Sequence, residues 1–180
     1  MIDTYKIILL DPLSRCVNDK IDIYVLEAKD FDSHIIYPSS SDSTSEDVQV
    51  QNANKLLHFV GNGVVGAETR QDSPLYIKSD KVLSLAVPFQ PITSVFHEHG
   101  DQSKEASVLQ FVHGLAHKIQ CIPYKGSCLT VTHQIYAHRT IPHLLVQDIK
   151  ITNPTDEDVI LSTERGGLSK WLTSVVYTKK

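Results

Sequence analysis

The sequence predicts an all-β protein, a large antiparallel β-sandwich of the supersandwich type, and three observations support this. Apolar runs of strand length recur along the 180 residues, and turn-forming residues separate most of them. Residues 128–136 alternate strictly, with Leu129, Val131, His133 and Ile135 on one face. A hydrophobic content of 41% with 21% charged residues is ordinary for one globular domain with a sizeable core.

The expected strands follow one another along the whole chain, without the intervening helices of βαβ units. They are residues 7–10, 21–26, 57–60, 75–77, 82–87, 108–113, 116–122, 128–136, 144–152, 159–162 and 172–178. Residues 101–120 also fit a helical pattern, but Gly114 in their middle favours a hairpin turn. The strands at 128–136 and 144–152 are joined by a polar corner that contains Pro142.

We expect one domain whose core is residues 57–180. Residues 1–56 form a less clearly assigned N-terminal segment, and within it residues 38–54 are rich in serine and acidic side chains. Such a composition buries too little apolar surface to pack, so an exposed, mobile loop is expected there.

The charge and hydropathy exclude several classes of protein. A net charge of −4 argues against a nucleic-acid-binding module. No stretch approaches the ~20 apolar residues of a membrane span, and the N-terminus lacks the basic lead of a secretory signal. Asn153-Pro154-Thr155 is not a glycosylation acceptor because of its proline. From these residues we expect no targeting segment or anchor within the chain itself.

The motifs that could carry catalysis or ligand binding are better explained by structural roles. Gly61-Asn62-Gly63 lacks the Lys-Ser/Thr of a phosphate loop, and is expected to be a tight turn with Asn62 or Gly63 at positive φ. The weak metal-site candidates are His97, His99, His113 and His117. Their spacing shows no convergence of three or four ligands, so neither a metal nor another cofactor is expected. The sequence has no nucleophile elbow, and the spacing of its carboxylates singles out no catalytic pair. We therefore expect that the protein is not an enzyme.

For two sites, the residues alone leave two interpretations of their role open. Arg139, in the corner with His138, Pro142 and His143, either pins the corner to a neighbouring strand or binds a carboxylate ligand; pinning is favoured. The C-terminal residues Trp171, Val176 and Tyr177, with the segment 87–96, are candidates for a partner interface. In the other interpretation, which is slightly favoured, Trp171 packs in the core and does not contact a partner.

The chain has three cysteines: Cys16, Cys121 and Cys128. Cys121 and Cys128 flank a turn-like insert, so either a short disulfide joins them or both are reduced and partly buried thiols. Such a cross-link would add about 2–3 kcal/mol in an oxidising compartment.

Residues 57–161 resemble an uncharacterised animal family of single-pass type I endoplasmic reticulum membrane proteins. The motifs in common are Gly61-Asn62-Gly63, Val87-Pro88-Phe89, the hairpin that ends at Cys121, the Cys128 that opens the next strand, Ala137-His138-Arg139, Pro142-His143 and Asn153-Pro154-Thr155. The resemblance implies a lumenal domain and favours the Cys121–Cys128 disulfide. It also implies a membrane anchor outside this chain.

A more distant resemblance is to the N-terminal β-sandwich of glycosidases and phosphorylases that cleave α-linked disaccharides. It rests on residues 59–66, 109–118 and 144–153. In that family the catalytic acid belongs to a later helical barrel, so no catalytic residue is carried over.

The resulting expectation is a non-catalytic lumenal domain that acts as an accessory or scaffold subunit in a complex with other endoplasmic reticulum membrane proteins, a lipid-handling or protein-maturation assembly being compatible. The alternatives are the N-terminal domain of a carbohydrate-active enzyme and a histidine-based metal- or pH-sensing module.

Overall fold

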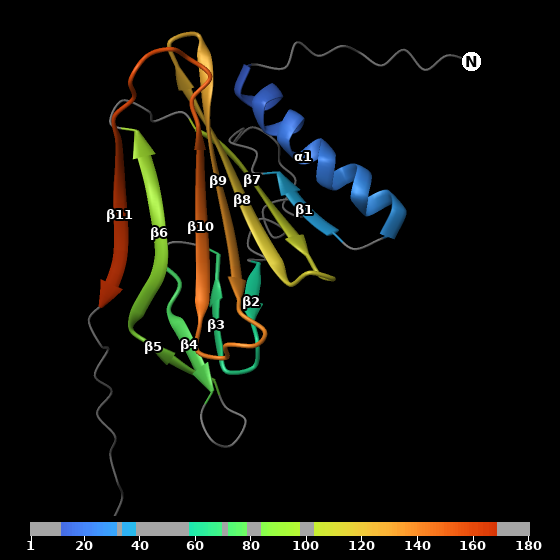
Figure 1. The fold of residues 1–180 in the computed structure, drawn as a ribbon, viewed down its shortest axis with the longest axis vertical. Helices are drawn as coiled ribbons and strands as arrows, with labels where there is room; N and C mark the ends of the chain where they lie inside the picture. The colour runs from blue at the N-terminus through green and yellow to red at the C-terminus, as the bar shows by residue number, and fades with distance from the viewer. Residues whose placement is uncertain are drawn as a thin grey trace, which may run out of the picture.

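The computed structural model describes residues 12–31, 34–38, 58–69, 72–78, 84–97 and 103–168. These residues form three antiparallel sheets and one helix, so the prediction of an all-β fold is confirmed. Figure 1 shows the long central sheet with the helix on one side and two smaller sheets on the other. The expected loop at 38–54 lies outside the described residues except for Pro38.

The central sheet has five strands in the order β1-β7-β8-β9-β10. Their bounds are His34–Pro38, Lys104–Gln110, Leu115–Tyr124, Ser127–Ala137 and Leu145–Thr152, respectively. Strands β7 and β8 form the hairpin predicted from Gly114, which adopts a φ of +66° in the turn between them. The helical alternative for this segment is therefore excluded.

Two smaller sheets complete the fold. A two-stranded sheet pairs β6 (Phe89–His97) with β11 (Leu161–Leu168). A four-stranded sheet has the order β2-β3-β4-β5, with bounds Phe59–Gly61, Val65–Glu68, Leu75–Lys78 and Ser84–Val87. In Figure 1 the four-stranded sheet lies at the end of the molecule where β6 begins and toward which β11 runs.

The helix α1 (Pro12–Phe31) corrects the prediction of a strand at 21–26. Val17 and Ile21 are buried, and Leu13 and Tyr24 pack beside them. These positions follow the i, i+4, i+8, i+11 spacing of one helix face. Residues 23–26 are a short apolar run of strand length, but they belong to this longer helical period, and Leu26 is in fact exposed. The other outlying predictions, 7–10 and 172–178, lie outside the described residues.

The central sheet is covered on both faces at β8 and β9, whereas β10 is exposed along much of its length. One face receives α1, whose Val17 and Ile21 pack on Ala106, Val108 and Ile119 of β7 and β8. The opposite face receives β6, β2 and β11, and its inner residues include the predicted row of Leu129, Val131, His133 and Ile135. The alternation read from the sequence is confirmed: these four side chains are at most 3% exposed.

Candidate functional site

The Gly61-Asn62-Gly63 turn connects β2 and β3. Gly63 has a φ of +85°, as predicted for one of the two central residues, and the turn is closed by the Asn62 side chain. Asn62 Oδ1 accepts hydrogen bonds from the backbone N–H groups of Val64 (3.0 Å) and Val65 (3.1 Å). An asparagine is suited to this position because its short amide reaches the backbone two and three residues on.

The other end of the Asn62 amide joins the turn to the distant corner between β9 and β10. Asn62 Nδ2 donates to the carbonyl oxygens of His138 (2.8 Å) and Pro142 (3.1 Å). Two of the motifs on which the resemblance rests therefore meet through the Asn62 side chain, whose two acceptors are 76 and 80 residues away in the sequence. Their meeting satisfies backbone groups that would otherwise need water.

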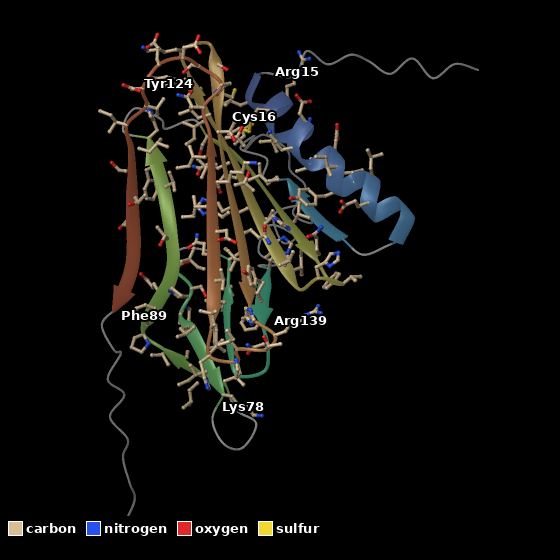
Figure 2. The ribbon with its side chains drawn as sticks, viewed as in Figure 1. Arg15, Cys16, Lys78, Phe89, Tyr124 and Arg139 are labelled. Atoms are coloured by element: carbon tan, nitrogen blue, oxygen red, sulfur yellow. A yellow bond between two sulfur atoms is a disulfide. The ribbon has the colours of Figure 1, made fainter. Side chains whose placement is uncertain are left out.

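Within the corner, His138 acts as a local cap. Its Nδ1 lies 3.2 Å from the backbone nitrogen of Thr140 and 3.0 Å from that of Ile141, and both N–H groups donate to it. Arg139 Nη2 donates to the carbonyl oxygens of Val112 (3.0 Å) and His113 (3.4 Å) in the β7–β8 turn. Figure 2 shows Arg139 at the end of the central sheet where these turns lie. Arg139 thus makes the pinning contact that the sequence favoured.

A polar cluster that the sequence did not indicate joins the central sheet to β6. Gln147 Oε1 accepts the N–H of Thr93 (2.8 Å), and Gln147 Nε2 donates to the Thr93 carbonyl (2.8 Å). The side-chain amide thereby replaces a strand partner for one residue of β6. Gln147 Nε2 also donates to His133 Nδ1 at 2.9 Å.

His133 is held neutral by this arrangement. Its Nδ1 faces an amide nitrogen that can only donate, so Nδ1 is unprotonated and the ring proton lies on Nε2. Burial, and then the positive charge of Lys118, lower the pKa of His133 to about 4. The side chain is a structural acceptor near neutral pH rather than a titrating group.

A small cavity of about 60 Å³ lies beside His133, between the central sheet and β6. Lys118 and Glu105 line it and form an ion pair of 3.0 Å, while Thr69 and Ser94 add hydroxyl groups. Such a volume accommodates a few water molecules, since one water needs about 10–15 Å³ of this kind of space. The lining thus combines an ion pair with hydroxyl groups.

The histidine candidates are not brought together. His97 contacts the ring of Tyr124, with 5.5 Å between centroids, on the β6 side of the sheet. His117 is buried on the helix side, where its Nε2 hydrogen-bonds Gln110 Oε1 (2.9 Å) and its ring lies 5.0 Å from that of Tyr24. His113 is exposed in the β7–β8 turn, and His99 lies outside the described residues. Within the described ranges, no three His, Cys, Asp or Glu side chains are grouped as metal ligands.

The predicted Cys121–Cys128 disulfide is wrong: Cys121 is joined to Cys16 of α1, and Cys128 is in no disulfide. The register explains the error. Cys121 lies opposite Thr130, and Cys128 lies opposite Pro123, so the two cysteines are diagonal neighbours. Diagonal positions are about 7–8 Å apart, beyond the usual 4.4–6.8 Å between the Cα atoms of a disulfide. The observed pair spans 6.2 Å and closes a sequence separation of 105 residues.

Two hollows lie at the end of the molecule that carries the corner. The first, which we call the corner groove, has a volume of about 270 Å³ and is lined by Val65, Leu75, Phe89, Pro91, Ile92, His143, Leu144, Leu145 and Gln147. Phe89 and Leu144 are 40% and 39% exposed there. The second is about 290 Å³ and lies over the turn, beside Phe59 and Tyr76. Val65 lines both, so the two hollows adjoin.

Of the interface candidates, only the segment 87–96 is described. This segment contains the last residue of β5, Val87, and most of β6. Its Ile92 and Val95 are buried in the core, while Phe89 and Phe96 are exposed. Trp171, Val176 and Tyr177 lie outside the described residues. Ile92 and Val95 are buried although they are three positions apart, so the strict alternation of a strand does not separate the exposed from the buried side chains here.

The site therefore defines an all-β domain in which a turn and a corner are locked to each other beside an apolar groove. A profile of the family described as an uncharacterised conserved protein (DUF2152) matches residues 11–180, and the chain belongs to this family.

Curated relatives agree with this assignment. The "Uncharacterized protein KIAA2013 homolog" of Xenopus tropicalis is 32% identical over 106 residues, which are 56% of this chain and 17% of the relative. The protein of the same name from Xenopus laevis is 31% identical over 106 residues, with the same shares. The matched part thus spans about a sixth of these relatives. No solved structure matches the chain.

Proposed function

We propose that this chain is a non-catalytic, lumenal interaction domain of a longer endoplasmic reticulum membrane protein, and that it binds a protein partner through the corner groove. The observation that carries the proposal is the groove itself. Phe89 and Leu144 expose large apolar side chains to solvent around a hollow of about 270 Å³. Contiguous exposed apolar surface of this kind is typical of protein-binding sites.

The support beneath the groove fits a binding role. Leu144 follows the corner that Asn62 and Arg139 fix, and its own N–H donates to the Ile141 carbonyl (3.1 Å). On the other side, Phe89 stands on β6, which Gln147 ties to β10. A surface with so little freedom loses little conformational entropy when a partner binds.

The disulfide supports the lumenal location. A Cys16–Cys121 cross-link between a helix and the buried sheet persists in an oxidising compartment and is rare in the cytosol. The one described helix is too polar to cross a bilayer. The membrane anchor in this proposal belongs to the longer protein.

Purification of the full-length protein from its own cells in mild detergent, followed by mass spectrometry, tests the partner. We expect a stoichiometric set of membrane proteins that is lost with Leu144→Asp and retained with the matched control Ile160→Asp. Ile160 is equally apolar and 75% exposed, it immediately precedes β11, and it does not line the groove. Elution of the wild-type protein alone would contradict the proposal.

A glycosylation reporter tests the location separately. Pro154→Ala converts Asn153-Pro154-Thr155, in which Asn153 is exposed, into Asn-Ala-Thr, an acceptor that is modified only in the lumen. We expect an endoglycosidase-sensitive increase in mass in the full-length protein. The double variant Pro154→Ala, Thr155→Ala is the control without an acceptor, and an unmodified Pro154→Ala protein would contradict the lumenal location.

A further inference from the structure

We infer that the three cysteines form a thiol–disulfide exchange site, in which Cys128 is the nucleophile and the Cys16–Cys121 disulfide is its substrate. Two observations that are independent of the proposed binding function lead here. A disulfide joins α1 to β8, and a reduced thiol stands on the neighbouring strand β9. The step moves the attachment of α1 from β8 to β9.

The register of β8 and β9 places all three sulfurs on one side of the sheet. Paired residues of antiparallel strands point to the same face, and so do residues two apart. Cys121 is paired with Thr130, and Cys128 with Pro123, so Cys121, Thr130 and Cys128 share the face that α1 covers. Figure 2 shows the sulfur bond at Cys16 lying between α1 and this sheet.

The sulfur of Cys16 is the one that approaches β9. Cys16 Sγ lies 3.7 Å from Thr130 Oγ1. Cys128 is two residues from Thr130 along the same face, a Cα separation of about 6.7 Å in a strand. Cys121 and Cys128 are diagonal neighbours about 7–8 Å apart, too far for a direct disulfide without a shift of the backbone. The helix cysteine therefore bridges the distance that the two strand cysteines cannot.

Solvent access differs between the two strand cysteines. Cys121 is fully buried, whereas Cys128 is half-buried beside the exposed Lys125–Gly126 turn. A thiol must ionise to react, and contact with water favours its thiolate form. Cys128 is consequently the residue in position to begin the exchange.

The exchange step is balanced within the chain. Cys128 loses its proton to solvent, and its thiolate attacks Cys16 Sγ. The Cys16–Cys128 bond forms as the Cys16–Cys121 bond breaks, and the electron pair leaves on Cys121 Sγ, which takes up a proton. One disulfide and one thiol are present before and after, so no external oxidant or reductant is required.

Disulfide mapping of the 180-residue chain tests the inference. The folded wild-type protein is held at mildly alkaline pH, about 8.5, where an ordinary thiol is half ionised, and is then quenched with acid, alkylated and digested without reduction. We expect peptides linked through Cys16 and Cys128 together with alkylated Cys121, and their absence in Cys128→Ser. Retention of only the Cys16–Cys121 link in the wild-type protein over many hours would overturn the inference.

Two single variants test which sulfur is attacked. After exposure of the folded proteins to oxidised glutathione, Cys121→Ser is expected to form the Cys16–Cys128 link. Cys16→Ser is expected to leave Cys121 and Cys128 unlinked, because of their diagonal spacing. Equal formation of a Cys121–Cys128 link in Cys16→Ser would overturn the assignment of Cys16. Should either variant fail to fold, the wild-type map decides the question alone.

Discussion

Acidification is expected to destabilise the fold through His133. The folded state keeps this ring neutral, with a pKa of about 4, because it is buried, because Lys118 is near, and because Gln147 donates to its Nδ1. The unfolded chain titrates near the ordinary value of about 6.5. Between these two values the unfolded state binds more protons, so stability is complete above pH 6.5 and is lost as the pH falls toward 4.

The size of the effect follows from the pKa of His133 in the folded and unfolded states. A tenfold difference in proton affinity corresponds to about 1.4 kcal/mol, so a decrease from about pH 7 to about pH 5 removes about 2 kcal/mol of unfolding free energy through this residue. Burial also lowers the pKa of His58, which adds to the loss with the same sign. The ion pair of Lys118 with Glu105 is close to His133 and partly offsets the charge of Lys118.

Urea unfolding near pH 7 and near pH 5 measures this loss, with His133→Gln as the comparison. Glutamine keeps an oxygen that can accept from Gln147 but has no proton to gain, so the variant is expected to lose about 2 kcal/mol less between the two pH values. The same pH dependence in both proteins would refute the neutral, buried state of His133.

Three further predictions concern the supports of the fold. Asn62→Ala removes two donated and two accepted hydrogen bonds, and is expected to cost about 2–4 kcal/mol by urea unfolding. Gly166→Ala places a Cβ against the backbone oxygen of Gln90, well inside van der Waals contact, so thermal unfolding should show a loss of about 1–3 kcal/mol; Gly114→Ala, which has open space but a φ of +66°, should lose about 1 kcal/mol. Reduction of the Cys16–Cys121 disulfide should lower the unfolding free energy by about 4–5 kcal/mol, since it closes a loop of about 100 residues. An unchanged unfolding free energy for Asn62→Ala, an equal loss for the two glycine variants, or an unfolding curve that does not change with reductant would contradict the respective prediction.

The parts of the fold that the sequence predicted are those in which local pattern and burial agree. Strand β9 shows this best, because its odd-numbered side chains form the inner face of the sandwich and its apolar residues alternate accordingly. The Gly63 turn and the Gly114 hairpin were predictable for a related reason: glycine alone enters positive φ without cost, so it marks the turn in the sequence.

The parts that were missed depend on contacts between distant segments. The partner of Cys121 is 105 residues away in a helix whose short apolar run is typical of a strand, and no local spacing indicates that pair. Gln147 and Thr93 meet only because two sheet edges adjoin, so neither residue stands out in its own strand. The helix itself was predictable, since Leu13, Val17, Ile21 and Tyr24 have helical spacing over a longer window.

The central claim, that the corner groove binds a protein partner in the lumen, is tested most directly by site-specific photocrosslinking in living cells. A photoreactive amino acid is placed at Leu144 in the full-length protein, and at Ile160 as the control position. The account predicts a discrete cross-linked product from position 144 and none from position 160. No product at position 144, or products of equal yield at both positions, would contradict it.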